Sequence, residues 1–124
     1  LLVSNIKADG LIVSTPTGST AYNLAAGGPI LSPELAAVAI TPICAHSLTL
    51  RPIILPETAH ITMIPQHRSD TVVLTLDGQY SVDLKSGDQI HITKFKKHAL
   101  QIFKSPERDY FSLLREKLKY GYRD

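Results

Sequence analysis

The sequence predicts a mainly β, α+β fold: a single β-sandwich-like domain over residues 1–124, with short helices and a C-terminal helix. Three observations support this prediction. Apolar and polar residues alternate over several short runs between residues 60 and 102, as they do in half-buried strands. Turn-forming residues separate these runs, and apolar side chains recur at helical spacing near the end of the chain. With 124 residues, 44% of them hydrophobic, the chain can bury one small core.

The first predicted element is a strand. Leu11 to Ser14 is a short apolar run that follows the turn-forming pair Asp9-Gly10. It leads directly into Thr15-Pro16-Thr17-Gly18, where proline and glycine predict a turn. The chain therefore leaves the first strand through a sharp, hydroxyl-rich bend.

Two short helices are predicted after this bend. Residues Thr20 to Ala26 contain good helix formers, and Gly27-Gly28-Pro29 ends them with a left-handed cap followed by a helix-stopping proline. A second brief helix or turn is expected from Ser32 through Ala39, because Ser32 is a favoured N-cap and Pro33 is favoured at the first helical position.

The middle of the chain predicts an antiparallel sheet or sandwich. The alternating runs are Ile61–Met63, Val72–Leu76, Tyr80–Leu84, Ile90–Thr93 and Leu100–Ile102. Asp77-Gly78 is predicted as a hairpin turn between two of these strands, since this pair is favoured in tight hairpins. Lys85 to Asp88 is predicted as the next turn, and the later strands are expected to continue a meander.

The last predicted element is an amphipathic helix. Ser105-Pro106-Glu107 supplies a cap, a first-turn proline and an acidic residue. Tyr110, Leu114 and Leu118 then recur at helical spacing, and Gly121 can end the helix. This apolar stripe needs a surface to pack against.

Composition argues against several kinds of partner. The formal net charge is only +2, and the basic residues form no obvious stripe apart from Lys94 to His98 and the last helix, so nucleic acid is not expected. No apolar run approaches the length of a membrane span, and the single cysteine, Cys44, fits a reducing compartment. We therefore expect a soluble, cytoplasmic protein with neither nucleic acid nor membrane as partner.

No metal site is predicted. Two histidine pairs are seven residues apart, His60 with His67 and His91 with His98, but turns or strand breaks separate the members of each pair. No cysteine or carboxylate cluster completes a ligand set. The basic cluster from Lys94 to Lys97 could meet a phosphate, although a solvated hairpin end is the default interpretation.

The hydroxyl-rich bend is the candidate binding element. Residues 14–29 read STPTGSTAYNLAAGGP. A strand that enters a helix through a glycine-containing turn exposes backbone N–H groups, and Thr17, Ser19 and Thr20 add hydroxyls. Such a site can hold ribose hydroxyls, phosphates or an adenine edge. The competing interpretation is that Ser19 or Thr20 only caps the helix, which is worth about 1 kcal/mol. The known glycine-rich nucleotide motifs and the GxSxG nucleophile motif are missing from this bend.

Four stretches carry a resemblance to a known family. They are DGLIVSTPTGSTAY at residues 9–22, AGGPI at 26–30, TPICAHSL at 41–48 and RPI at 51–53. In order and in sequence these stretches closely resemble the NAD kinases. Asp77-Gly78-Gln79, after an alternating strand, fits a later motif of that family, so the resemblance extends over most of the chain. The terminal helix is its least diagnostic part.

The resemblance implies ATP-dependent transfer of a phosphoryl group to the 2′-hydroxyl of the adenosine ribose of NAD, which gives NADP. In that family the matching part is the β-rich C-terminal domain, which supplies most of the dinucleotide site and assembles homodimers or homotetramers. Carried over, Asp9 would lie near the nicotinamide-side ribose or amide. Thr17, Thr20, Ala21 and Tyr22 would line the pocket, with Tyr22 packing against a ring.

The catalytic part of the family pattern is not found in residues 1–124. Phosphoryl transfer needs phosphate binding, a divalent metal such as Mg²⁺ and an aspartate that orients or deprotonates the attacking hydroxyl. The family carries that aspartate in a Gly-Gly-Asp-Gly loop and carries an Asn-Glu pair for adenine, and neither occurs here. Both are expected upstream of residue 1, so no catalytic residue is assigned and this chain alone is expected to be inactive. The sequence leaves open whether ATP or polyphosphate is the donor.

Three further residues have weaker assignments. Cys44 and His46 suggest a thiol and a base, but structural roles are favoured, and the resemblance makes them pocket-edge residues. Asp77 has two equally favoured interpretations, a turn residue or a site residue, since Asp-Gly needs no ligand to form a hairpin. Two other functions remain open: a noncatalytic, regulatory nucleotide-binding β-module, and a lipid kinase relative.

Overall fold

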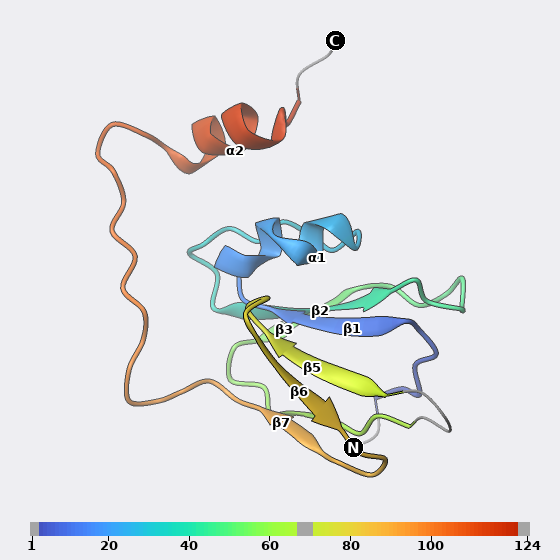
Figure 1. Ribbon diagram of the computed structural model, residues 1–124. Helices are drawn as coiled ribbons and strands as arrows, with labels where there is room; N and C mark the ends of the chain where they lie inside the picture. Colours follow the sequence, from blue (N-terminus) through green and yellow to red (C-terminus); the bar gives the residue numbers. More distant parts are fainter. Residues whose placement is uncertain (1–2, 67–70, 122–124) are drawn as a thin grey trace. The chain divides into compact units, whose positions relative to one another are not determined.

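The computed structural model describes residues 3–66 and 71–121 (Figure 1). The chain divides into two compact units, with the boundary between Lys94 and Phe95. Strands dominate, helices are few and the sheets are antiparallel, which confirms the prediction of a mainly β fold. The further prediction that residues 1–124 form one domain remains a prediction.

The first sheet has three antiparallel strands in the order β1-β2-β3. They span Gly10–Ser14, Ala37–Ile43 and Ile53–Pro56. Gly10 pairs with Ile43 and Ser14 with Ala39, so the two ends of β1 lie against opposite ends of β2. β1 confirms the predicted first strand.

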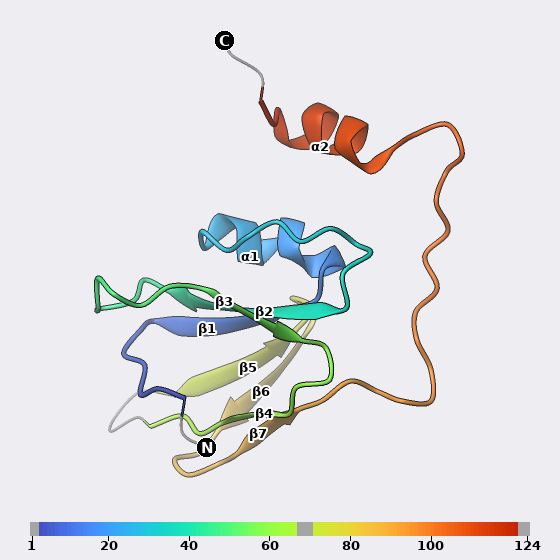
Figure 2. The ribbon, with the colours of Figure 1, turned by 180° about the vertical axis from the view of Figure 1, so that it is seen from behind.

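Two short helical pieces follow β1 and lie over one face of this sheet (Figures 1 and 2). They are the 3-10 helix η1, Thr17–Thr20, and the α-helix α1, Tyr22–Ala25. Gly27 has a φ of 79°, which confirms the left-handed position predicted after the helix. Of the predicted turn or helix after Ser32, the turn is confirmed, because the Leu35 N–H donates to the Ser32 carbonyl at 3.0 Å. The helix through Ala39 is wrong, because β2 begins at Ala37 and pairs there with β3. Pairing with Pro56 and Leu55, far along the chain, outweighs the local preference of the alanines.

Four strands form two pairs on the other side of the first sheet (Figures 1 and 2). β4, Ile61–Met63, pairs with β7, Ile90–Ile92, and β5, Val72–Leu76, pairs with β6, Tyr80–Leu84. All four strands form where the alternating pattern predicted them, but β6 is not half-buried, because four of its five residues are exposed. The predicted meander is wrong, because β7 pairs with β4 across the inner hairpin. Leu100–Ile102 is not a strand either; it is exposed and pairs with no strand that the structure describes.

Both predicted turns of this region are confirmed. Asp77 and Gly78 have φ angles of 51° and 68°, and the Gln79 N–H donates to the Leu76 carbonyl at 3.0 Å. These are the left-handed angles of a tight hairpin turn, which glycine adopts without a steric cost. The second turn is closed by the Asp88 N–H, which donates to the Lys85 carbonyl at 3.1 Å.

The second unit contains the helix α2, Tyr110–Leu118. The apolar spacing predicted this helix, but its predicted start at Ser105 is wrong. Asp109 is the N-cap, and its carboxylate accepts a hydrogen bond from the Ser112 N–H at 2.9 Å. The helix ends at Leu118, before the left-handed Lys119 and the predicted Gly121.

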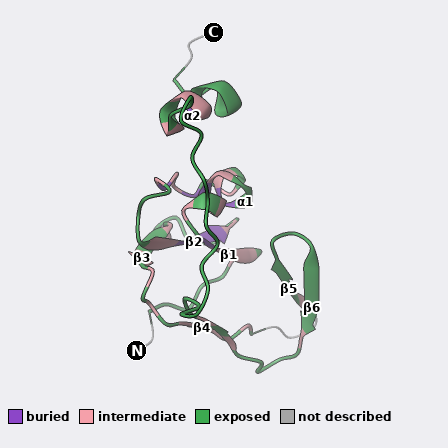
Figure 3. Ribbon diagram, turned by 90° about the vertical axis from the view of Figure 1, so that its left-hand side faces the viewer, coloured by how far each residue is buried: buried purple, intermediate pink, exposed green. Residues whose placement is uncertain are grey.

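Burial is concentrated where η1 and α1 meet β1 and β2 (Figure 3). Leu31 and Ala39 are buried there together with four polar residues, Ser14, Ser19, Asn23 and Thr41. The core of the first unit is therefore partly polar and lies directly beneath the hydroxyl-rich bend. In the part of the chain that the structure describes, no helix has the length and hydropathy of a membrane span.

Candidate functional site

A buried hydrogen-bond network joins the bend to the sheet. The Thr41 hydroxyl on β2 donates to the Asn23 side-chain oxygen at 2.6 Å. The Asn23 side-chain nitrogen donates to the carbonyls of Ser19, at 3.1 Å, and Pro29, at 3.0 Å. Asn23 is 1% exposed and Thr41 is 0% exposed, so these bonds are shielded from water. One side-chain amide thus ties η1, the segment after α1 and the central strand together.

The Ser19 hydroxyl belongs to the same network. It donates to the Pro16 carbonyl at 2.6 Å and accepts from the Leu31 N–H at 3.0 Å. Ser19 is fully buried, so its hydroxyl is used inside the protein. We call Ser19, Asn23 and Thr41 the buried frame.

The alternative that Ser19 or Thr20 only caps the helix is wrong. The helix α1 has no side-chain cap, and the Thr20 hydroxyl donates back to the Thr17 carbonyl at 3.4 Å.

Gly28 allows the frame to close. A Cβ placed on Gly28 would overlap the side-chain amide of Asn23, whose atoms lie where that carbon would be. The Gly28 N–H also donates to the Asn23 carbonyl at 2.8 Å. The glycine pair after α1 therefore has two functions: Gly27 supplies the left-handed backbone, and Gly28 permits the close approach of Asn23.

The frame holds a short stretch of surface. Thr17, Ala21 and Tyr22 are exposed and Thr20 is half-buried, and we call these four residues the wall. The wall contains all the residues of the bend that were predicted to line a dinucleotide pocket. Tyr22 is 73% exposed, so most of its ring is open to a ligand. Hydroxyls and one aromatic ring on a rigid support can bind a nucleoside by hydrogen bonding and stacking.

The tip of the β5–β6 hairpin lies against the wall. A Cβ placed on Gly78 would lie 3.2 Å from Cε2 of Tyr22 and 3.4 Å from its hydroxyl oxygen. Asp77, the neighbour of Gly78 at the tip, is exposed. The structure therefore brings the predicted Asp77 close to the wall.

The other three predicted site residues lie at the opposite end of the β1–β2 pair. Asp9 precedes β1, and Cys44 and His46 follow β2; we call these residues the far-end cluster. The Asp9 carboxylate lies 3.6 Å from Nε2 of His46, and both side chains are about two-thirds exposed. Cys44 is exposed and has a φ of 47°. β1 lies between the cluster and the wall, and its four residue steps from Gly10 to Ser14 extend over about 13 Å.

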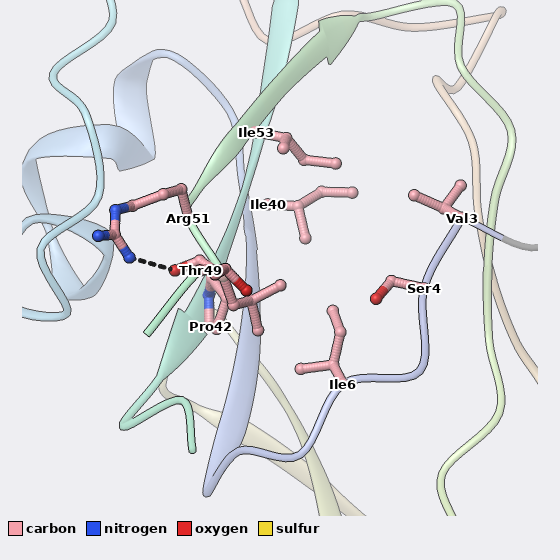
Figure 4. A pocket seen from close by; sticks show the side chains of 9 residues that line it. Val3, Ser4, Ile6, Ile40, Pro42, Thr49, Arg51 and Ile53 are labelled. Atoms are coloured by element: carbon pink, nitrogen blue, oxygen red, sulfur yellow. Dashed lines mark hydrogen bonds between the residues drawn. The ribbon is translucent and has the colours of Figure 1, made fainter. Parts of the chain in front are cut away.

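A cavity of about 260 Å³ opens elsewhere, on the face of β2 that α1 does not cover (Figure 4). Ile40, Ile53, Val3 and Ile6 are among its mostly apolar lining residues. Arg51 borders it, but its guanidinium donates to the Leu50 carbonyl at 3.0 Å and to the Leu48 carbonyl. The cavity contains none of the predicted site residues and offers few polar groups to a dinucleotide.

The other polar candidates contribute little to a site. Lys94 of the basic cluster forms an ion pair with Glu57 at a half-exposed position. The His91 ring bonds the Thr62 hydroxyl at 3.1 Å, and His67 lies outside the described residues. Within residues 3–66 and 71–121, no three His, Cys, Asp or Glu residues are grouped to hold a metal ion.

Sequence reasoning missed Asn23 and Thr41. An asparagine inside a helix of good formers and a threonine within a strand are weak signals by themselves. The useful signal was Gly28, because a second glycine beyond the left-handed cap indicates a close approach. The partner of that approach becomes visible only in three dimensions.

The fold is a mainly antiparallel β domain that carries an exposed, hydroxyl-bearing wall. The sequence matches the ATP-NAD kinase C-terminal domain over residues 1–104. The NAD kinase of Koribacter versatilis is 50% identical over 122 residues, which are 98% of this chain and 42% of that protein. The crystal structure of yeast NADH kinase complexed with NADH is similar with a TM-score of 0.89 and 38% identity, over 98% of this chain and 36% of that chain. An NAD kinase from Archaeoglobus fulgidus in complex with ATP has a TM-score of 0.68 and 34% identity, over 76% of this chain and 35% of that chain.

The chain belongs to the ATP-NAD kinase C-terminal domain family, since the family match covers most of its residues. This confirms the resemblance drawn from the four sequence stretches. The chain spans 42% of the length of the Koribacter relative. Neither a lipid kinase nor a noncatalytic module is favoured by these similarities.

Proposed function

We propose that this chain is the dinucleotide-binding domain of an NAD kinase, which transfers a phosphoryl group from ATP to the 2′-hydroxyl of the adenosine ribose of NAD. The observation that carries the proposal is the wall on its buried frame, within the stretch that matches the family. Two similar structures support the ligands, because one was solved with NADH and the other with ATP. Polyphosphate remains the alternative donor.

In this proposal the wall holds a nucleoside half of the dinucleotide. Tyr22 stacks on a ring through its exposed face, and the hydroxyls of Thr17 and Thr20 bond ribose or phosphate oxygens. Ala21 adds a small side chain that lets the ligand approach the backbone. These residues bind and orient the acceptor. The residues that activate the hydroxyl and neutralise the phosphates lie outside residues 1–124.

The far-end cluster lies apart from the wall. Asp9, Cys44 and His46 lie at the other end of the β1–β2 pair from the wall, so they would contact a part of the dinucleotide different from the part that Tyr22 contacts. We propose that Asp9 contacts the nicotinamide-side ribose or amide and that Cys44 and His46 border the pocket. We further propose that the protein is a homodimer or homotetramer located in the cytoplasm.

A divalent metal such as Mg²⁺ would supply the neutralisation of phosphate charge that phosphoryl transfer needs. Among the residues that the structure describes, no three His, Cys, Asp or Glu side chains are grouped to hold a metal ion, so no metal ligand is assigned to this chain.

Calorimetric titration of NAD into the full-length gene product tests the proposal, with Tyr22→Ala as the variant. We expect the variant to bind NAD about tenfold more weakly, because base–aromatic stacking is worth about 1–3 kcal/mol. Tyr120→Ala is the matched control, since Tyr120 is also exposed but lies in the second unit. Unchanged affinity and turnover in Tyr22→Ala would remove the wall from the site.

A comparison of acceptors separates the alternatives. The full-length protein is expected to phosphorylate NAD and to leave diacylglycerol unmodified when each is supplied with ATP. Phosphorylation of diacylglycerol would instead support the lipid kinase alternative. NAD binding without any phosphorylation, with ATP or with polyphosphate, would support the regulatory module.

A further inference from the structure

The tip of the β5–β6 hairpin leaves little room for a side chain between Gly78 and the Tyr22 ring. A Cβ on Gly78 would lie 3.2 Å from Cε2 and 3.7 Å from Cζ of the Tyr22 ring. Ordinary contacts with a Cβ are longer, so any larger residue at position 78 would displace the ring by a few tenths of an ångström. The contact is with the hydroxyl edge of the ring and leaves the ring mostly exposed.

Few other contacts fix the orientation of this ring. Tyr22 begins a helix of only four residues and is 73% exposed. Its hydroxyl has no hydrogen-bond partner among the residues that the structure describes. The hairpin tip therefore restricts the rotation of a side chain that would otherwise be free to reorient.

We propose that Gly78 is a positioning residue for the dinucleotide site. Because it has no side chain, the β5–β6 hairpin can lie against the hydroxyl edge of Tyr22 and hold the ring at one tilt. A nucleoside base then stacks on a ring that is already oriented, which reduces the entropy lost on binding. This inference rests on the proposed function. It adds the β5–β6 hairpin to the site, through a packing contact with Tyr22 rather than through a hydrogen bond.

Two substitutions at position 78 test the contact in the full-length protein. Gly78→Ala and Gly78→Asn both add a Cβ beside Tyr22, and asparagine tolerates the left-handed φ of 68° better than alanine. We expect both variants to raise the KM for NAD about fivefold, a part of the stacking contribution, with kcat unchanged. The Asn variant keeps the test informative if the Ala variant folds poorly.

Gly87→Ala is the matched control for backbone strain. Gly87 also has a left-handed φ, of 91°, but a Cβ there would meet nothing within 4 Å. We expect it to lower the melting temperature by a similar amount while the KM for NAD stays unchanged. An equal rise of KM in Gly87→Ala and in the Gly78 variants would overturn the inference.

A double variant shows whether Gly78 acts through Tyr22. In a Tyr22→Ala background the ring is gone, so adding Gly78→Asn is expected to raise KM no further. A further fivefold rise in the double variant would overturn the inference. Failure of the unmodified protein to bind NAD would reject the proposed function itself, whereas normal NAD binding by the Gly78 variants would reject this inference alone.

Discussion

The two ends of the β1–β2 pair are held in different ways. At the wall end, the side chains of Asn23 and Thr41 are almost fully buried. They form hydrogen bonds to each other, and Asn23 also bonds the Ser19 carbonyl. At the far end, the side chains of the Asp9–His46 pair are about two-thirds exposed. The chain is held there by backbone hydrogen bonds, such as the one from the His46 N–H to the Lys7 carbonyl. The wall is thus supported by buried side-chain bonds, whereas the far-end cluster is supported by backbone bonds and one exposed side-chain pair.

The substitution Asn23→Ala is expected to have the largest effect on stability, because it removes the centre of the buried frame at the wall end. The substitution leaves the Thr41 hydroxyl and the Ser19 and Pro29 carbonyls without their partner in a buried site. We expect the free energy of unfolding to fall by about 3 kcal/mol, since each unsatisfied buried polar group costs about 1–3 kcal/mol. Urea unfolding of the full-length protein, followed by circular dichroism, measures this loss.

The control is Asn5→Ala, at the other asparagine of the chain, which is exposed. It is expected to leave stability within about 0.5 kcal/mol of the unmodified protein. Thr41→Val should cost less than Asn23→Ala, and the two losses should not add because the residues share one bond. Independent, additive losses would contradict a shared frame.

The far end predicts a much smaller effect on stability. Asp9→Asn removes the charge that faces His46, and exposed ion pairs contribute about 0–1 kcal/mol. We expect the same unfolding measurement to change by less than about 0.5 kcal/mol. A loss as large as that of Asn23→Ala would show that the far end is also part of the rigid core. A weaker NAD affinity at unchanged stability would support the proposed role of Asp9.

The smallest expected effect is a local one, in α2. Hydrogen bonds from the Ser112 hydroxyl and then the Ser112 N–H hold the pKa of Asp109 below its ordinary value of 3.8. A carboxylate with a lowered pKa stabilises the folded state above the unfolded value, and this contribution is lost as the pH falls through the lower, folded pKa. Hydrogen exchange of residues 110–118 should therefore accelerate only under strongly acidic conditions.

Asp109→Asn is the matched variant, because asparagine also caps helices but does not titrate. Its exchange rates in α2, corrected for intrinsic chemistry, should lose the acid-dependent step. The same acid-dependent step in both proteins would assign the titration to another group.

The strands with strong alternation were predictable, and those without it were not. β5 and β6 followed from period-two patterns on either side of Asp77-Gly78. β2 was missed because its alanines favour a helix and because it contains Pro42. Proline has no backbone N–H to donate to a neighbouring strand. Pro42 is tolerated because β3 pairs only with Ala37–Ile40, so on that side of β2 no described strand needs a donor at Pro42.

The candidate site was predictable in its surface and not in its support. The family motif identified Thr17, Thr20, Ala21 and Tyr22, which the structure exposes or half-buries on one segment. The motif could not show which hydroxyls of the bend are buried and which are exposed. The Ser19 hydroxyl is buried against Leu31, twelve residues away, and accepts a hydrogen bond from its N–H. Asn23 and Thr41 are eighteen residues apart, and no local pattern links them.

A crystal structure of the full-length protein with bound NAD tests the central claim most directly. We predict that a ring of NAD stacks on Tyr22 and that its ribose or phosphate lies within hydrogen-bonding distance of Thr17 or Thr20. The side chains of Ser19, Asn23 and Thr41 should keep their internal bonds and stay out of contact with the ligand. NAD bound away from the wall, or bonded directly to Asn23, would contradict the account.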